Sequence, residues 1–151
     1  MNLSKNVNVI QCLDYSAAGT EKKTSSIVDM AGYDGVMFIV GLGKLIDKGT
    51  LDAYCEQHDS NTTSGMSRVP ASIAPLTVDS KMAELKQSCI IVDLFQPEKR
   101  YIQCNIDPKE QGAVILGITA IQYKGKVTPP IKDASVLAIN FYQSPEDGKG
   151  K

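Results

Sequence analysis

Apolar and polar positions alternate in short segments along most of the chain, and turn-forming residues separate these segments. The most hydrophobic segment, residues 36–42, is apolar at each of its first five positions. Apolar side chains on both sides are typical of a strand that is covered on both faces. Residues 50–58 alternate strictly, with Leu51 and Cys55 on the same side. This second pattern predicts a strand with one buried and one solvated face.

The second half of the chain contains three strand patterns in succession. Residues 88–95 and 100–106 flank a short connection with a turn-favouring proline, Pro97, and they predict a β-hairpin. Residues 113–123 are rich in valine and isoleucine and carry few charges, so they predict a further buried strand. Together these segments predict three consecutive antiparallel strands.

The remaining patterns are weaker. Alternation over residues 6–13 predicts a first or edge strand, and residues 135–142 predict a last strand. Residues 79–86 favour a helix that is barely two turns long and opens with a capping Asp79 or Ser80.

Strands at near-regular intervals, with turn signals between them, predict an all-β protein rather than a parallel α/β sheet. We expect an antiparallel β-sandwich or β-barrel-like single domain with at most one short helix and extended termini. The 151 residues suffice to bury roughly 70% of the surface of the unfolded chain. Because two successive prolines follow residue 128, we expect a β domain over residues 1–128 and an extended C-terminal arm over residues 129–151, as part of the same domain.

The charges are nearly balanced, with 16 basic and 17 acidic residues. A net charge of −1 gives no electrostatic reason to expect nucleic acid or a membrane as a partner. The longest apolar run is far shorter than the ~20 residues that a membrane-spanning helix requires. The N-terminus is polar and lacks the apolar stretch of a signal peptide, so we expect synthesis in a cytoplasm.

No residue pattern indicates catalysis. The single histidine, His58, has no partner in a known catalytic motif. The four cysteines are widely spaced and form no C-x-x-C pair, so neither a zinc site nor a redox motif is indicated. We therefore predict that the chain is not an enzyme, and we assign no catalytic, cofactor-binding or metal-binding residue.

Four segments resemble small virion proteins of tailed bacteriophages. They are SSIVDMAGYDGVMF at residues 25–38, DLFQPEKRY at 93–101, AIQY at 120–123 and SPED at 144–147. In that group a D-M-x-G-[YF]-[DE]-G-V stretch, a D-[VL]-[YF]-x-P-x-x-R-Y stretch and an A-I-x-Y segment recur before a proline-containing tail. These motifs are turns and strands rather than catalytic signatures.

The resemblance implies a structural protein encoded among head genes, a capsid decoration or cement protein on the outer surface of the virion head. Its partner would be the major capsid protein, and copies of the chain would associate as trimers or dimers. Such a protein binds the assembled shell and not its dissociated parts, so its binding free energy adds to the stability of the shell. The extended ends of the chain are the candidate arms.

Two alternatives stay open beside this interpretation. A head-tail connector or tail component would show the same β-rich, non-catalytic sequence. A ligand- or glycan-binding β-sandwich would need exposed aromatic residues or a carboxylate pair in a cleft, and the chain has no tryptophan and only 3 phenylalanines.

Arginine, aromatic and neighbouring residues at two places suggest an interface, because protein interfaces favour these types. The predicted interface residues are Lys99, Arg100 and Tyr101 at the hairpin, with Pro129, Pro130, Phe141 and Tyr142 in the tail.

Overall fold

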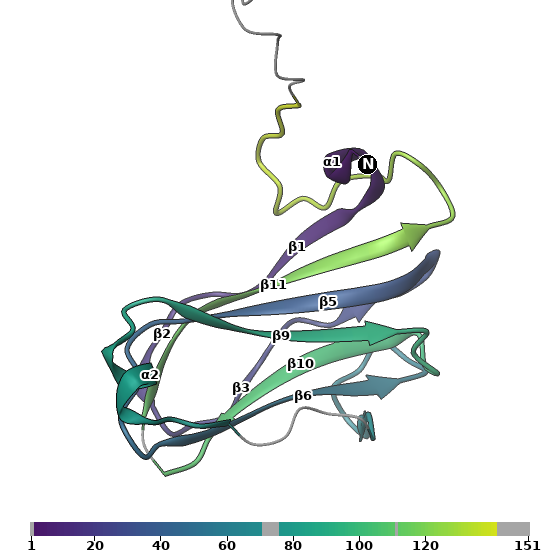
Figure 1. The fold of residues 1–151 in the computed structure, drawn as a ribbon. Coiled ribbons are helices and arrows are strands. Elements are labelled where there is room, and N and C mark those ends of the chain that lie inside the picture. The colour runs from purple at the N-terminus through teal and green to yellow at the C-terminus, as the bar shows by residue number, and fades with distance from the viewer. Residues whose placement is uncertain (1, 71–75, 111, 142–151) are drawn as a thin grey trace, which may run out of the picture.

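The computed structural model describes residues 2–70, 76–110 and 112–141, and it confirms the all-β fold. Two antiparallel sheets pack against each other as a sandwich (Figure 1). We call them sheet A, in the order β1-β11-β5-β9 with β2 beside β11, and sheet B, in the order β3-β10-β6-β7 with β4 beside β10 and β8 beside β6.

The strands of sheet A are β1 (Asn8–Leu13), β2 (Ser16–Gly19), β5 (Tyr33–Leu42), β9 (Ser88–Phe95) and β11 (Ala113–Gly125). Those of sheet B are β3 (Lys23–Thr24), β4 (Val28–Asp29), β6 (Thr50–His58), β7 (Ser67–Arg68), β8 (Leu76–Thr77) and β10 (Tyr101–Pro108).

The core lies between the sheets and follows the period-two pattern of the strands. From β5 it receives Val36, Phe38 and Val40, all completely buried, and β10 faces them with Ile102 and Ile106. Cys55 and Cys104 lie opposite each other on β6 and β10 and are buried free thiols, as their apolar neighbours in the sequence predict.

The predicted hairpin at residues 88–106 is wrong in its pairing. The two strands are consecutive, but β9 pairs with β5 in sheet A, and β10 pairs with β6 in sheet B. The connection crosses from one sheet to the other, and Gln96 N donates to Asp34 O over 2.7 Å at its start. A turn signal therefore located the reversal of the chain, but it did not determine which strands bond to each other.

Two short helical segments accompany the strands. The predicted helix is α2 (Ser80–Glu84), and Asp79 caps it by accepting a hydrogen bond from Met82 N over 2.8 Å. A single turn, α1 (Leu3–Asn6), lies where an extended N-terminus was expected, and Val7 N donates to Leu3 O at its end.

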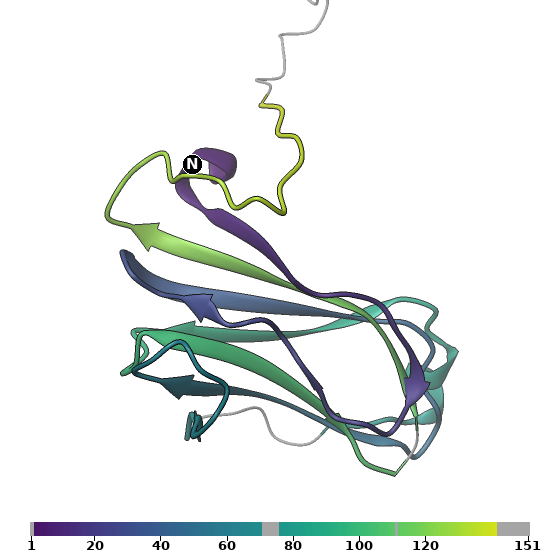
Figure 2. The same ribbon diagram turned by 180° about the vertical axis from the view of Figure 1, so that it is seen from behind.

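The predicted last strand over residues 135–142 does not form in the described part of the chain. Beyond Gly125, the described residues 126–141 contain neither helix nor strand, and Tyr142 lies outside the described residues. This segment, which we call the arm, passes α1 and β1 and then runs away from the sandwich (Figures 1 and 2).

The arm contacts the free edge of β1 through hydrogen bonds that each involve a side chain, so its backbone adds no strand there. Lys132 donates to the backbone oxygens of Ser4 and Val7, Asp133 N donates to Asn8 Oδ1 over 3.1 Å, and Gln11 N donates to Ser135 Oγ over 3.1 Å.

Candidate protein-binding surface

The outer faces of the two sheets differ in chemistry. On sheet B, the residues that alternate with the core-facing residues of β10 and β6 are polar or carry polar groups, and they face each other in pairs. Gln103 donates to Glu56 Oε2 over 2.8 Å, and Thr24 Oγ1 donates to Asn105 Oδ1 over 2.6 Å. The outer face of sheet B is therefore polar, but part of it is buried, because Asn105, Gln103 and Asp52 are only 0%, 4% and 5% exposed.

The outer face of sheet A consists mainly of apolar side chains. The registers of β1, β11, β5 and β9 place one set of alternating residues on this face, opposite the core. Its large apolar members are Val9, Met37, Ile39, Ile91, Phe95, Leu116, Ile121 and Tyr123. Ile91 keeps 51% of its surface exposed, and Phe95 and Leu116 keep 48% each.

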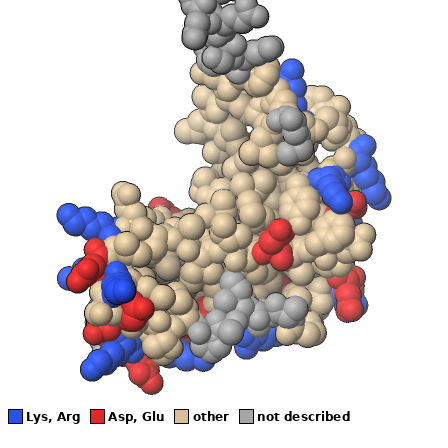
Figure 3. All heavy atoms as spheres, in the orientation of Figure 1, with Lys and Arg blue, Asp and Glu red and all other residues tan. Residues whose placement is uncertain are grey.

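Charged side chains lie mostly around this surface rather than on it. In Figure 3 the region over β5 and β9 is largely uncharged, and the Lys, Arg, Asp and Glu side chains gather towards the two ends of the molecule. Asp93 is a charged residue on this face, between Ile91 and Phe95. Exposed apolar surface of this extent makes the face a candidate for contact with another molecule.

At one end of the outer face, two aromatic rings stand on either side of a glycine. Tyr123, Gly35 and Phe95 are neighbours across three strands, and a Cβ at Gly35 would lie only 2.2 Å from the Tyr123 ring. The glycine therefore lets the ring lie across β5, parallel to the Phe95 ring, with 6.4 Å between the centroids.

The same tyrosine also makes a polar contact. Tyr123 Oη donates to Asp93 Oδ1 over 2.6 Å, and Lys124 Nζ lies 4.7 Å from the centre of the Phe95 ring. Partial burial, together with the hydrogen bond to Asp93, raises the pKa of Tyr123 to about 12.

At the other end, a β-bulge turns an additional apolar side chain outward. The register between β11 and β5 shifts between Ile115 and Gly117, so Leu116 has no partner on β5 and lies against Gly41. Gly117 adopts φ +148°, and a Cβ there would lie 2.8 Å from Leu13 O.

The arm borders the outer face and presents apolar side chains of its own. Leu137 is 94% exposed, and Ile139 and Phe141 are exposed by 51% and 54%. Between the arm, α1 and β1 lies a cleft of about 280 Å³, lined by Leu3, Val7, Val9, Val136 and Ile139 among others. A second hollow, of about 470 Å³, lies between α1 and Tyr123.

The three predicted interface residues near the β9–β10 connection already have partners in the chain. Lys99 Nζ contacts Asp59 Oδ2 at 2.9 Å. Arg100 donates twice to Asp29, over 2.7 and 2.8 Å, and lies over the Tyr101 ring at 5.1 Å. The hydrogen bonds from Arg100 lower the pKa of the Asp29 carboxyl group.

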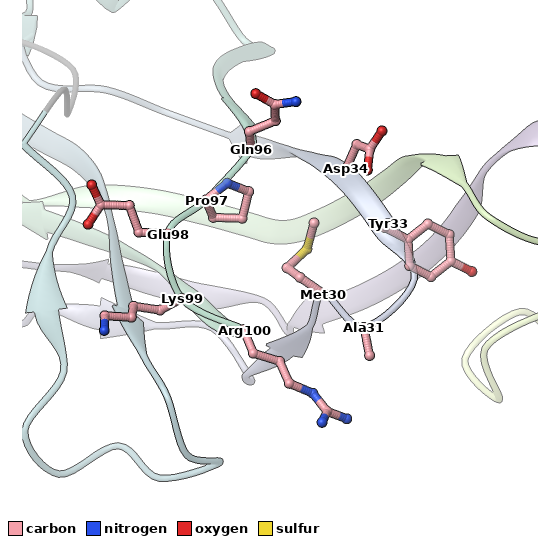
Figure 4. A pocket seen from close by; sticks show the side chains of 9 residues that line it. All are labelled: Met30, Ala31, Tyr33, Asp34, Gln96, Pro97, Glu98, Lys99 and Arg100. Carbon is pink, nitrogen blue, oxygen red and sulfur yellow. The ribbon is translucent and has the colours of Figure 1, made fainter.

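Lys99 and Arg100 also line a hollow of about 420 Å³, together with the turn between β4 and β5 (Figure 4). This hollow lies beside the β9 end of sheet A, whereas the predicted tail residues follow the β1 edge. The structure therefore does not bring the two predicted groups together.

The predicted tail residues differ in exposure. Pro129 is exposed and follows a cis peptide bond, Pro130 is buried, and the Phe141 ring lies 5.0 Å from Lys5 Nζ. Tyr142 lies outside the described residues.

The residues of the sheet A outer face were missed because alternating apolar residues in strands were interpreted as core. The sequence did contain a signal for this face. Residues 36–42 and 88–95 have apolar side chains at odd and at even positions, and this pattern indicates a strand with two covered faces.

In residues 2–70, 76–110 and 112–141, no cluster of three or more His, Cys, Asp and Glu side chains could hold a metal ion. His58 Nδ1 accepts a hydrogen bond from Ser60 N. A hydrogen bond with Cys55 and burial raise the pKa of Cys104, so this thiol stays protonated and is a poor nucleophile. Within the same residues, no helix is long and apolar enough to cross a membrane.

No family model matches the chain, and no curated protein matches it. Solved structures with a similar arrangement of strands include carbohydrate-binding modules. One is the CBM22-1–GH10 part of Clostridium thermocellum endo-1,4-beta-D-xylanase 10B complexed with xylohexaose, with TM-score 0.43 and 14% identity over 83% of this chain and 27% of that chain.

Another is the CBM22-1 xylan-binding domain of Paenibacillus barcinonensis Xyn10C, with TM-score 0.40 and 9% identity over 81% of this chain and 88% of that chain. A third is the xylan-binding module CBM15, with TM-score 0.37 and 10% identity over 84% of this chain and 96% of that one. At these TM-scores the likeness says nothing about what this chain binds.

Proposed function

We propose that this chain is a non-enzymatic structural protein of a bacteriophage virion, which decorates the capsid shell and binds it through the outer face of sheet A. The observation that carries the proposal is the incomplete covering of β5. Its sequence is apolar on both sides, but sheet B covers only one of them. The other side is the centre of the exposed apolar surface.

The chemistry of this surface favours a protein partner. Burying a large apolar side chain contributes about 1.5–3 kcal/mol, so covering the exposed halves of several such side chains stabilises a complex by several kcal/mol. The face offers isoleucine, valine, methionine and leucine around two aromatic rings, and this composition resembles the core of a protein interface.

The location in a virion is supported by the four sequence segments that resemble small virion proteins of tailed bacteriophages. The major capsid protein is then the partner of the outer face. Many copies that bind the assembled shell, and not its separate subunits, stabilise that shell by mass action. No reaction, nucleic acid or membrane is required.

The test is co-sedimentation of the purified protein with shells assembled without it, followed by thermal melting of bare and decorated shells. Saturable binding and a raised melting temperature are expected. Ile39→Glu places a charge at the centre of the outer face and should abolish both effects. His58→Glu places the same charge on the outer face of sheet B and should preserve them.

Two results would overturn the decoration role. One is the absence of binding to shells, and binding to isolated tails or connectors instead would support a connector or tail component. The other is equal binding by the Ile39→Glu and wild-type proteins, because the outer face would then not be the contact.

A glycan-binding role is the second candidate, and the pair of rings with adjacent polar groups favours it. Parallel aromatic rings beside Asp93 and Lys124 provide a stacking surface and hydrogen-bonding groups. Calorimetric titration with soluble oligosaccharides tests this role. Tyr123→Ala should remove any heat of binding, and Tyr54→Ala, on the outer face of sheet B, should not.

A further inference from the structure

We propose that copies of this chain associate by one-way strand exchange, in which arm residues 136–141 of one copy add to the β9 edge of the next copy. This association does not depend on binding to a capsid. It would explain why a segment with a strand pattern lies unpaired beside its own sandwich.

The donor segment has the sequence period of a strand. Leu137, Ile139 and Phe141 alternate with smaller or polar residues, and all three are at least half exposed. In a strand these three side chains lie on one face. No pairing of residues 136–141 with another strand exists in the described part of the chain.

The acceptor is the edge of β9 that faces away from β5. Gln96 N donates to Asp34 O, and hydrogen-bonded pairs alternate with non-bonded pairs in an antiparallel ladder, so the next pair, Gly35 and Phe95, is non-bonded. Every second residue of β9 therefore directs its N–H and C=O groups outward: Cys89, Ile91, Asp93 and Phe95. Within the described residues, no backbone hydrogen bond reaches these groups.

This edge lacks the features that normally protect an exposed strand. Proteins guard such edges with lysine, proline, bulges or a covering segment. Over eight residues, β9 contains no proline and a single charged residue, Asp93. An added strand that carries Leu137, Ile139 and Phe141 on the outer side would extend the apolar surface next to Ile91 and Phe95.

The geometry requires a second copy as the donor. Lys132, Asp133 and Ser135 hold the arm at β1, and β1 and β9 are opposite edges of sheet A. Three strand spacings separate these edges by about 14 Å, and six extended residues span about 20 Å. Crossing its own sheet would leave the arm too few residues to lie along β9.

The arm also points away from its own sandwich in both views (Figures 1 and 2). Because donor and acceptor lie on opposite edges, the contact is head-to-tail. Such contacts close into rings or continue as open chains.

The test measures molar mass by sedimentation and light scattering for the full-length protein and two complementary variants. Truncation after Ser135 removes the donor and keeps the anchor at β1. Ile91→Lys places a charge on the acceptor edge. We expect a concentration-dependent oligomer for the full-length protein and single chains for each variant alone.

Mixing the two variants is the decisive step. The truncated chain still has an open β9 edge and the Ile91→Lys chain still has an arm, so together they should form an equimolar heterodimer and no larger species. Thr119→Lys is the matched control, since it places lysine in the same row of the outer face but on β11, and it should assemble like the wild type.

Three outcomes would overturn strand exchange. These are a full-length protein that remains a single chain, a truncated variant that keeps the full oligomer, and a mixture that stays monomeric while circular dichroism shows both variants folded. An oligomer lost with Ile39→Glu but kept after truncation would indicate packing of outer faces instead. Binding to shells is measured separately, so failure here leaves the decoration role open.

Discussion

At the scale of single residues, one buried amide joins three strands. Gln122 on β11 is 1% exposed, its Nε2 donates to Asp29 O on β4 over 2.7 Å, and its Oε1 accepts from Asn8 Nδ2 on β1 over 2.9 Å. A buried amide is tolerated in the core because these hydrogen bonds satisfy it. It connects β11 and β1 of sheet A to β4 of sheet B.

Gln122→Leu should lower the free energy of unfolding by about 2–3 kcal/mol, because the Asp29 carbonyl and the Nδ2 group of the buried Asn8 both lose their hydrogen bonds to Gln122. Urea denaturation measures this change. Thr119→Val on the same strand removes an exposed hydrogen bond to Gln11, and it should cost less than about 0.5 kcal/mol. Equal costs for the two variants would contradict the role assigned to Gln122.

The Tyr123 hydroxyl predicts a dependence of stability on alkaline pH. Its pKa is raised to about 12 from the ordinary value of 10.0, so the folded state favours the protonated phenol. The stabilisation is complete below pH 10 and is lost as the pH rises towards 12. Tyr123→Phe should reduce the alkaline loss of stability in urea denaturation. Tyr33→Phe serves as the comparison, because burial alone raises the pKa of Tyr33 and no contact with Asp93 is involved.

At the scale of elements, the bulge in β11 determines what the outer face presents. Two residues, Ile115 and Leu116, occupy the space opposite a single register position, and the change of register moves Leu116 outward. The backbone returns to the ladder at Gly117, whose positive φ and close approach to Leu13 O exclude a side chain.

Gly117→Ala should therefore destabilise the protein by about 1–3 kcal/mol, because alanine is strained at this φ and its Cβ would meet a carbonyl oxygen. Gly19→Ala provides the control, since its nearest neighbour would be 3.9 Å away and its backbone needs no positive φ. Thermal unfolding of the two variants distinguishes them, and a similar midpoint for both would argue against strain at the bulge.

At the scale of the whole molecule, the sandwich has one polar and one apolar outer surface, and an arm extends from the β1 edge. The exposed side chains of the arm contribute little to the stability of a single copy. They contribute only when another molecule covers them.

The thermal midpoint of the full-length protein should therefore rise with protein concentration, because association stabilises the folded state by mass action. Truncation after Ser135 should remove this dependence and leave the midpoint at low concentration nearly unchanged. Scanning calorimetry over a dilution series measures both effects. A large drop in the midpoint of the dilute truncated protein would show that the arm stabilises its own sandwich.

The sequence by itself determined the all-β class, the core-facing side chains of β6 and β10 and the helix capped by Asp79. The predicted solvated face of residues 50–58 is wrong at Asp52, which is 5% exposed and pairs with Lys109. Period-two alternation and capping are local, so each can be read from a few neighbouring residues. The division into residues 1–128 and 129–151, the interface residues and the virion location remain predictions.

Only the tertiary structure decided the partners of the strands. The alternation along β9 shows which of its side chains share a face. It does not show that β9 forms its hydrogen bonds with β5 rather than with β10. Likewise, residues 36–42 indicate two covered faces, and the fold covers one. Which strands pair, and which sheet faces are covered, depends on residues far apart in the chain. A local sequence pattern does not contain that information.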